Sequence, residues 1–387
     1  IDEVGGFIDQ PEPRHTFLIV DGWHVLHGDH EDLMEKLGRI VADGLAARVH
    51  LVLTATRWSV VRPAIRDLIP QRIETKLGEP MDSLIDRKAQ LKVPALPGRG
   101  LTSSGETMLI ALSAQQDVAF IARSLVADQP PVPRLKLLPI SLMLADLPQL
   151  DPEQNSVLLG VGGPKLGAVN WDYLASQHIV CIGAQESGKS TLISTIIAGL
   201  TQIGRERARL VVIDHRRSHL GAIDPDMLAG YSASTQETEK LVAVMKITLE
   251  ERLPSAEVTP QQLKDRSWWT GPDIFLIVDN LDLVADMAFA PLLSVLPHAR
   301  DVGLHVVITR KSGGCVRALF QPFLAEIKDQ SPFIIVLDAD KDDGPLFGVR
   351  LKPQPPGRGV MIHHGTQQGL IQIAAADMPE ATEAKAS

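Results

Sequence analysis

Short runs of apolar residues recur along the second half of the chain, separated by longer stretches with apolar positions at helical spacing. The runs are Ile179–Ile182, Leu210–Ile213, Ile274–Val278, Leu304–Ile308, Phe333–Leu337, Gly359–Ile362 and Leu370–Ile373. Continuous runs of four or five apolar residues are typical of strands that are buried on both faces. Strands that alternate with helices predict an α/β fold, a mostly parallel sheet with helices on both of its faces.

The first half predicts a shorter series of the same kind, after opening residues that we expect to form a loop. The expected strands are 16–21, His50–Thr54, Arg72–Leu77 and Thr107–Leu112, and the expected helices are Glu31–Leu45, Val60–Leu68 and Gln116–Ala127. The proline-rich connector Gln129–Pro133 then predicts a domain boundary. Residues 1–130 therefore form one expected domain, residues 131–377 a second, and the Ala/Glu/Pro-rich residues 378–387 a disordered tail.

Three segments of the first domain recur in the same order in the second. The strand that ends at Asp21 matches the strand that ends at Asp279, a spacing of 258 (279 − 21). His50–Thr54 matches His305–Thr309 at a spacing of 255 (305 − 50), and Pro-Gly-Arg99-Gly matches Pro-Gly-Arg358-Gly at 259 (358 − 99). Collinear matches predict tandem modules. The first module lacks a phosphate loop, so we expect a truncated module in a piece of a longer protein.

The strongest chemical signal is the motif GxxxxGK[ST] over residues 183–191, between an apolar strand and a helical stretch. Its residues are Gly183, Ala184, Gln185, Glu186, Ser187, Gly188, Lys189, Ser190 and Thr191. Such a loop turns its backbone N–H groups toward a polyphosphate at a helix N-terminus. We expect Lys189 to bind the β- and γ-phosphates of ATP and Ser190 to coordinate Mg²⁺.

Asp279 closes an apolar strand and is the expected second Mg²⁺ ligand, as well as a catalytic carboxylate. The next residue is Asn280, where many P-loop ATPases have a glutamate. An amide can orient a water molecule but cannot accept its proton, so hydrolysis is expected to be slow. Thr309, at another strand end, is a candidate sensor of the γ-phosphate or a helix cap.

Further candidates keep two interpretations each. Arg300 could act as an arginine finger on a neighbouring subunit, or be a solvated helix-end residue. Asp214 could sense the nucleotide or simply close its strand. Arg57-Trp58 could face the next unit's nucleotide or stack on itself at a domain contact. Trp268-Trp269 could mark a partner surface or serve packing.

Composition narrows the class of protein. The 387 residues are 44% hydrophobic, no apolar run approaches membrane-spanning length, and the two cysteines match no metal-binding spacing. The net charge of −9 argues mildly against a nucleic-acid partner, which usually requires a basic face.

Several low-degeneracy segments together resemble the C-terminal tandem modules of the EccC family, the type VII (ESX) secretion ATPases of the FtsK/SpoIIIE group. They are Asp21-Gly-Trp23, Arg57-Trp58, Arg66-Asp-Leu68, Asp86-Arg87, Pro97–Gly100, Arg266–Trp269 and Pro355–Gly359. The resemblance covers nearly the whole chain. It implies a RecA/FtsK-like P-loop fold with ATP and Mg²⁺ as cofactors.

The resemblance also implies a role and partners. These motors act at the cytoplasmic side of the plasma membrane and export WxG100-type proteins, which they recognise by C-terminal tails. Their partners are the other ATPase modules and the ESX membrane complex, and a hexameric assembly is compatible with the family. The later modules are often degenerate, which agrees with Asn280. Two alternatives remain open: an FtsK-type DNA translocase, which needs a basic channel and active hydrolysis, and a scaffold with a vestigial nucleotide site.

Overall fold

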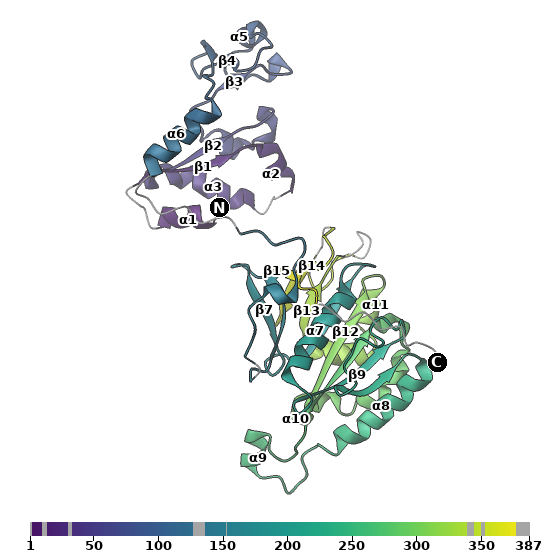
Figure 1. Ribbon diagram of the computed structural model, residues 1–387. Helices are drawn as coiled ribbons and strands as arrows, with labels where there is room; N and C mark the ends of the chain where they lie inside the picture. The colour runs from purple at the N-terminus through teal and green to yellow at the C-terminus, as the bar shows by residue number, and fades with distance from the viewer. Residues whose placement is uncertain are drawn as a thin grey trace, which may run out of the picture. The chain divides into compact units, whose positions relative to one another are not determined.

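The computed structural model describes residues 2–9, 14–29, 33–126, 136–151, 153–338, 344–349 and 353–376 (Figure 1). The chain divides into two compact units, unit 1 (residues 1–133) and unit 2 (residues 134–387). The predicted boundary at residue 130 and the predicted tail both lie outside the described residues. No helix in the described ranges is long and apolar enough to cross a membrane.

Unit 2 is built on one ten-stranded sheet. Its strands are β6 (Ser156–Gly162), β7 (Gly167–Asp172), β8 (His178–Gly183), β9 (Ala208–Asp214), β10 (Leu228–Ser232), β11 (Asp273–Asp279), β12 (Leu304–Lys311), β13 (Phe333–Val336), β14 (Arg358–His363) and β15 (Thr366–Ile373). Their order across the sheet is β10-β9-β11-β12-β8-β13-β14-β15-β6-β7. The run from β10 to β13 is parallel, and the remaining strands pair antiparallel. This architecture confirms the predicted α/β fold with a mostly parallel sheet.

Helices cover both faces of this sheet. They are α7 (Lys189–Ile203), α8 (Thr235–Glu250), α9 (Pro260–Asp265), α10 (Ala299–Val302), α11 (Cys315–Ala318) and α12 (Pro322–Asp329), joined by 3-10 helices at Leu144–Asp146, Leu281–Leu283, Asp286–Leu292 and Leu296–His298. Alternate residues of β11 face opposite sides: Leu276 packs in the core under α8 and α12, and Phe275 in the core under α7. Because both faces are buried, these strands are uniformly apolar.

Unit 1 is smaller and contains two separate sheets. Its strands are β1 (Thr16–Val20), β2 (Val49–Leu53), β3 (Glu74–Thr75), β4 (Arg99–Leu101) and β5 (Thr107–Leu109), and its helices are α1 (Asp2–Asp9), α2 (Trp23–Asp29), α3 (Leu33–Asp43), α4 (Pro63–Arg66), α5 (Arg87–Lys92) and α6 (Gln115–Val126), with 3-10 helices at Gly44–Ala47, Trp58–Val60 and Pro80–Asp82. β1 and β2 are parallel, and β3, β4 and β5 form an antiparallel sheet. One core lies around Trp23 and Leu37, on one face of β1 and β2.

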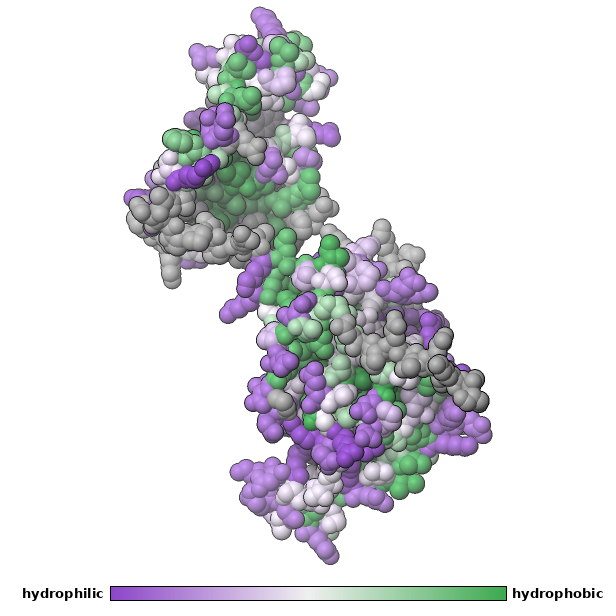
Figure 2. All heavy atoms as spheres, in the orientation of Figure 1, coloured by the Kyte–Doolittle hydropathy of each residue, from purple (hydrophilic) through white to green (hydrophobic). Residues whose placement is uncertain are grey.

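The opposite face of β1 and β2 is exposed, although it is as apolar as its counterpart in unit 2. Phe17 and Ile19 are 59% and 68% exposed, whereas the matching Phe275 and Ile277 are fully buried. Phe17 stacks on His50 with ring centroids 4.7 Å apart, and Phe275 stacks on His305 at 4.6 Å. Figure 2 shows this face as a green area over β1 and β2. In unit 2 the same face is covered by α7 and by β7.

Several predicted elements differ from the structure. The opening residues form helix α1, not the expected loop, because they pack against α3 through Val4 and Phe7. The helix expected over Val60–Leu68 is reduced to α4, since Pro63 sets its start. The strand expected over Arg72–Leu77 is reduced to the two residues of β3. Helix α8 and the hairpin β6–β7 were not predicted.

Candidate functional site

The phosphate loop lies at the centre of the unit 2 sheet, between β8 and the start of α7. β8 runs between β12 and β13, so the loop leaves the sheet at the carboxyl end of its parallel strands. Gly188 has a φ of 103°, and a Cβ there would lie 2.7 Å from the backbone nitrogen of Gly357. A Cβ at Gly183 would lie 2.3 Å from Ser187 Oγ. The local backbone therefore requires glycine at position 188, whereas a side chain at position 183 would collide with the side chain of Ser187.

Lys189 is folded back onto the loop. Its Nζ donates hydrogen bonds to the carbonyl oxygens of Gly183 at 3.1 Å and Ala184 at 2.5 Å. Burial lowers the pKa of Lys189, while the charges of Asp279 and Asp282 act in the opposite direction. An anion in the loop would offer this ammonium a stronger acceptor than two neutral carbonyls.

Asp279 lies directly opposite Ser190 and is held by several donors. Ser190 Oγ donates to Oδ2 at 3.0 Å, and Thr309 Oγ1 donates to Oδ1 at 2.6 Å. Burial of the carboxyl acts to raise its pKa, but contacts with His219, Thr309 and Ser190 prevail and hold the pKa of Asp279 below its usual value. The group is thus a fixed carboxylate beside a hydroxyl.

This pair of oxygen donors fits Mg²⁺. Magnesium is commonly held by one or two protein oxygens, with water and phosphate oxygens completing its shell. The described residues contain no cluster of three or more His, Cys, Asp or Glu side chains that could hold an ion without a nucleotide. A bound cation would act as a Lewis acid that neutralises phosphate charge, with Ser190 and Asp279 as its protein ligands.

A cavity of about 820 Å³ opens above the loop. Its lining includes Ala184, Gln185, Glu186, Ser187, Gly188, Lys189, Ser190 and Thr191, together with Arg216, Ser218, Asn280, Asp282, Leu283, Lys311, Ser312, Gly313 and Pro356. Its volume lies within the range of small-molecule sites. Asn280 is in the left-handed region with a φ of 59°, and its backbone N–H donates to Thr309 Oγ1 at 2.8 Å.

Arg300 lies outside this cavity. It belongs to α10, which precedes β12, whereas Thr309 lies near the opposite end of that strand. Thr309 lies five positions beyond Leu304, the first residue of that strand, which corresponds to about 17 Å along the strand. The structure therefore does not bring Arg300 to the nucleotide site of its own unit.

The other candidates have structural roles within unit 2. Asp214 is buried and accepts hydrogen bonds from the His219 backbone N–H at 2.8 Å and from the Tyr231 hydroxyl at 2.9 Å. Trp268 and Trp269 donate their indole N–H groups to the carbonyls of Arg252 and Asp301. The tryptophan pair thus packs against its own unit, with the Arg252 guanidinium stacked on Trp269.

Sequence reasoning missed two residues of the loop after β9. Arg216 lines the cavity, and the buried His219 ring lies beside Asp279. The available signal was the polar segment that follows the strand ending at Asp214, because loops at the carboxyl ends of parallel strands meet at one edge of the sheet.

Unit 1 repeats part of this arrangement. Thr54 Oγ1 donates to Asp21 Oδ1 at 2.5 Å and accepts from the Gly22 backbone N–H at 2.9 Å. Thr309, Asp279 and Asn280 make the same set of contacts in unit 2. The sequence repeat is therefore also a repeat of hydrogen bonds.

No protein-family model matches the sequence. It is 37% identical to the ESX secretion system protein EccC of Thermomonospora curvata over 93% of this chain and 29% of that protein. It is 36% identical to the ESX-4 protein EccC4 of Mycobacterium tuberculosis over 94% of this chain and 30% of that protein. A solved structure of T. curvata EccC (ATPases 2 and 3) in complex with a signal sequence peptide aligns at a TM-score of 0.71 and 36% identity, covering 93% of this chain and 68% of that one.

The chain belongs to the EccC family. It spans about 30% of the length of the curated relatives that it matches. EssC (ATPases 2 and 3) of Geobacillus thermodenitrificans shares the fold at a TM-score of 0.58 and 16% identity. The predicted resemblance is confirmed, and P-loop ATPase relatives imply nucleotide binding.

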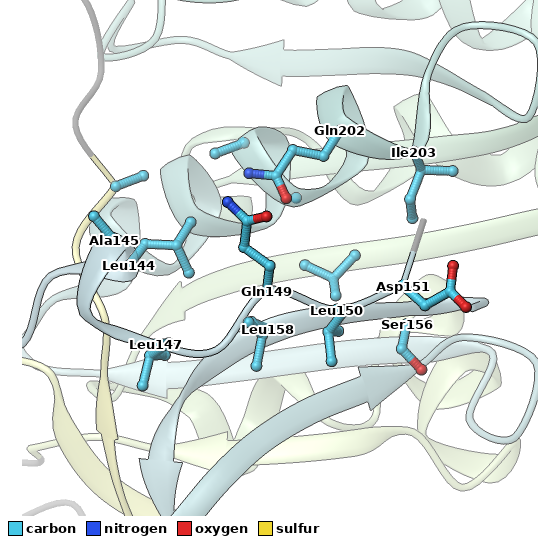
Figure 3. Close-up of a pocket in the computed structure, with 14 residues that line it drawn as sticks. Leu144, Ala145, Leu147, Gln149, Leu150, Asp151, Ser156, Leu158, Gln202 and Ile203 are labelled. Carbon is cyan, nitrogen blue, oxygen red and sulfur yellow. The ribbon is translucent and has the colours of Figure 1, made fainter. Parts of the chain in front are cut away.

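A second concavity of this EccC chain lies behind α7, away from the phosphate loop. It has a volume of about 340 Å³ and lies between segment 144–151, β6 and the last turns of α7. Leu144, Leu147, Leu150, Leu158 and Ile203 give it apolar walls. The carboxamides of Gln149 and Gln202 point toward one another across it (Figure 3). We call this concavity the α7 groove.

Proposed function

We propose that unit 2 is a MgATP-binding module of an ESX protein-export motor, with slow or regulatory hydrolysis. The observation that carries this proposal is the cavity in which the phosphate loop faces Asp279, Ser190 and Thr309. Lys189 would bind the β- and γ-phosphates, and Ser190 and Asp279 would hold Mg²⁺. The module would work at the cytoplasmic side of the plasma membrane, with the other ATPase modules and the ESX membrane complex as partners.

Slow hydrolysis is proposed from Asn280. This side chain follows the metal carboxylate and lines the cavity. An amide can hold a water molecule but has no basic site for its proton, so it cannot act as general base. Binding and release of nucleotide, without rapid turnover, suit a module that controls assembly or partner affinity.

We also propose that unit 1 is the back half of a second module of the same kind. The repeated contacts of Asp21, Gly22 and Thr54 support this, and so do the apolar residues on the exposed face of β1 and β2. The aligned structure, described as ATPases 2 and 3, agrees with two successive modules.

The test is MgATP affinity and turnover of the chain beside Lys189→Ala. Tight binding that the variant loses, with turnover near background, supports a regulatory nucleotide module. Fast turnover that depends on Lys189 would overturn the regulatory part of the proposal. Equal binding by both proteins would overturn the assignment of the site.

The α7 groove is the proposed seat of the C-terminal tail of a WxG100-type protein. Apolar walls with two carboxamides suit a peptide that buries aliphatic side chains and hydrogen-bonds through its backbone. An EccC structure aligned here carries a signal sequence peptide.

A labelled tail peptide should bind the chain in fluorescence anisotropy, and Leu147→Glu should weaken the affinity for this peptide at least tenfold. Leu263→Glu, on the exposed side of α9, is the matched control. Equal losses in both variants would exclude the α7 groove.

A further inference from the structure

His219 occupies a place beside the metal carboxylate that the proposed function leaves unexplained. The residue is 2% exposed, and its ring lies between α7 and β11. Its Nε2 is 3.4 Å from Asp279 Oδ2, the same oxygen that accepts the Ser190 hydroxyl. A buried imidazole in direct contact with this oxygen is a candidate for a role in the site.

The donors and acceptors around the ring define its tautomer. A carboxylate can only accept, so the nitrogen that faces Asp279 must carry hydrogen. Nδ1 lies 3.4 Å from Ser194 Oγ, one turn of α7 beyond Ser190, and can accept from that hydroxyl. Nε2 makes no regular hydrogen bond within the described residues. The acceptor that it faces there is Asp279 Oδ2, at 3.4 Å.

The backbone holds His219 in this inward position. Its own N–H donates to Asp214 Oδ2 at 2.8 Å, and the Tyr231 hydroxyl fixes the same oxygen at 2.9 Å. Asp214 ends β9, which pairs with β11 so that Asp214 and Asp279 lie side by side in the sheet. The loop is thus fastened to the strand next to the carboxylate, and the imidazole has little freedom to turn away.

We propose that His219 is a positioning residue for the divalent cation: its Nε2–H fixes Asp279 Oδ2 toward Ser190 and so sets the metal affinity of the nucleotide site. Thr309 on Oδ1, and Ser190 and His219 beside Oδ2, restrict the rotation of the carboxylate. Groups that hydrogen-bond a metal-binding carboxylate from behind orient it and tune its affinity. This inference rests on the proposed binding of MgATP by unit 2.

A purely structural role would be met better by an apolar side chain. The core on the α7 face of the sheet is apolar, and a buried N–H without a full hydrogen bond is unfavourable in such surroundings. An imidazole aimed at a charged oxygen is explained by what it does to that oxygen. A structural role of His219 would affect stability alone, whereas a positioning role would also affect the affinity of the site for the metal.

The experiment separates the affinity for the nucleotide from the affinity for the metal. A fluorescent N-methylanthraniloyl-ATP is titrated into the full chain with EDTA and with Mg²⁺, and Mn²⁺ binding to the complex is followed by EPR. His219→Leu should weaken Mn²⁺ binding about 10- to 100-fold, the usual loss for such outer partners. Nucleotide affinity in EDTA should change less than about twofold. His219→Gln, whose amide N–H can replace Nε2–H, should recover most of the metal affinity.

Two controls make the result decisive. His178 is an equally buried histidine at the opposite end of β8, and His178→Leu should lower stability without changing the metal affinity. Lys189→Ala should lose nucleotide in EDTA and in Mg²⁺ alike, which identifies the nucleotide site itself.

The proposal is overturned if His219→Leu keeps its metal affinity, or if its loss is no larger than that of His178→Leu. If His219→Leu fails to fold, the comparison passes to His219→Gln and His219→Asn. The shorter amide should bind metal more weakly, and equal affinities would contradict the proposal. If the parent chain binds no nucleotide, the proposed function fails and this inference fails with it.

Discussion

At the scale of single residues, a threonine beside a carboxylate recurs twice with different surroundings. Thr309 and Asp279 are buried, whereas Thr54 and Asp21 are exposed. A hydrogen bond to a buried charge has no replacement when its donor is removed, while water can replace the donor at an exposed site. The same contact should therefore contribute unequally in the two units.

Thr309→Val should lower the free energy of unfolding of unit 2 by about 1.5–3 kcal/mol, because a buried carboxylate loses a donor. Thr54→Val should cost unit 1 less than about 1 kcal/mol, since water can reach Asp21. Urea denaturation, read in the transition of the affected unit, checks both values. Equal losses would show that burial does not govern this contact.

His178 predicts a pH dependence of unit 2. Burial within the sheet lowers the pKa of His178 to about 3, although the hydrogen bond between its ring and Gln330 acts to raise it. The unfolded chain titrates near its usual value of about 6.5 and binds the proton first. The contribution of neutral His178 is thus complete above pH 6.5 and is lost as the pH falls from 6.5 toward about 3.

The measurement is the urea midpoint at pH 7 and pH 5.5, for the parent chain and for His178→Gln. Between pH 7 and pH 5.5 the free energy of unfolding of the parent should fall by roughly 1 kcal/mol more than that of the variant. This estimate follows from a slope of about 1.4 kcal/mol per pH unit below pH 6.5. Parallel losses in the two proteins would mean that His178 titrates normally in the folded state.

At the scale of elements, the predictable features are those carried by adjacent residues. The phosphate loop is one continuous motif, and the strands that end at Asp21 and Asp279 are short apolar runs. His219 and Arg216 could not be placed in the same way. Their position depends on β9 lying next to β11, an order of strands that no local pattern specifies.

The exposed face of β1 and β2 gives a prediction from matched elements. Ile19 and Ile277 occupy the same position in the repeat, but only Ile277 is covered by α7 and its neighbours. Ile277→Ala should destabilise unit 2 by about 2–5 kcal/mol through lost burial and a cavity. Ile19→Ala should change unit 1 by no more than about 0.5 kcal/mol.

Chemical denaturation of the two variants provides the comparison, with the parent chain as reference. A large loss for Ile19→Ala would mean that its face is covered in solution, for example by a second copy of the chain. Sedimentation at several protein concentrations would then reveal that association.

At the scale of the whole molecule, each unit has cores of its own. Trp23 and Leu37 mark a core of unit 1, whereas two large cores on opposite faces of the ten-stranded sheet stabilise unit 2. The described phosphate loop belongs to unit 2 alone. A ligand that binds only the folded form of one unit stabilises that unit by mass action.

Calorimetry should therefore show two unfolding transitions, and MgATP should raise the Tm of only one of them, that of unit 2. At a ligand concentration 100 times Kd, the stabilisation is about 2.7 kcal/mol. For a unit of this size that corresponds to a rise in Tm of roughly 5–10 °C. Lys189→Ala should abolish the rise, and EDTA should reduce it by removing the metal from Ser190 and Asp279.

A shift of both transitions together would show that nucleotide binding couples the units. A shift of the unit 1 transition alone would place the nucleotide near Asp21 and Thr54, and the assignment of the site to Lys189 would fall.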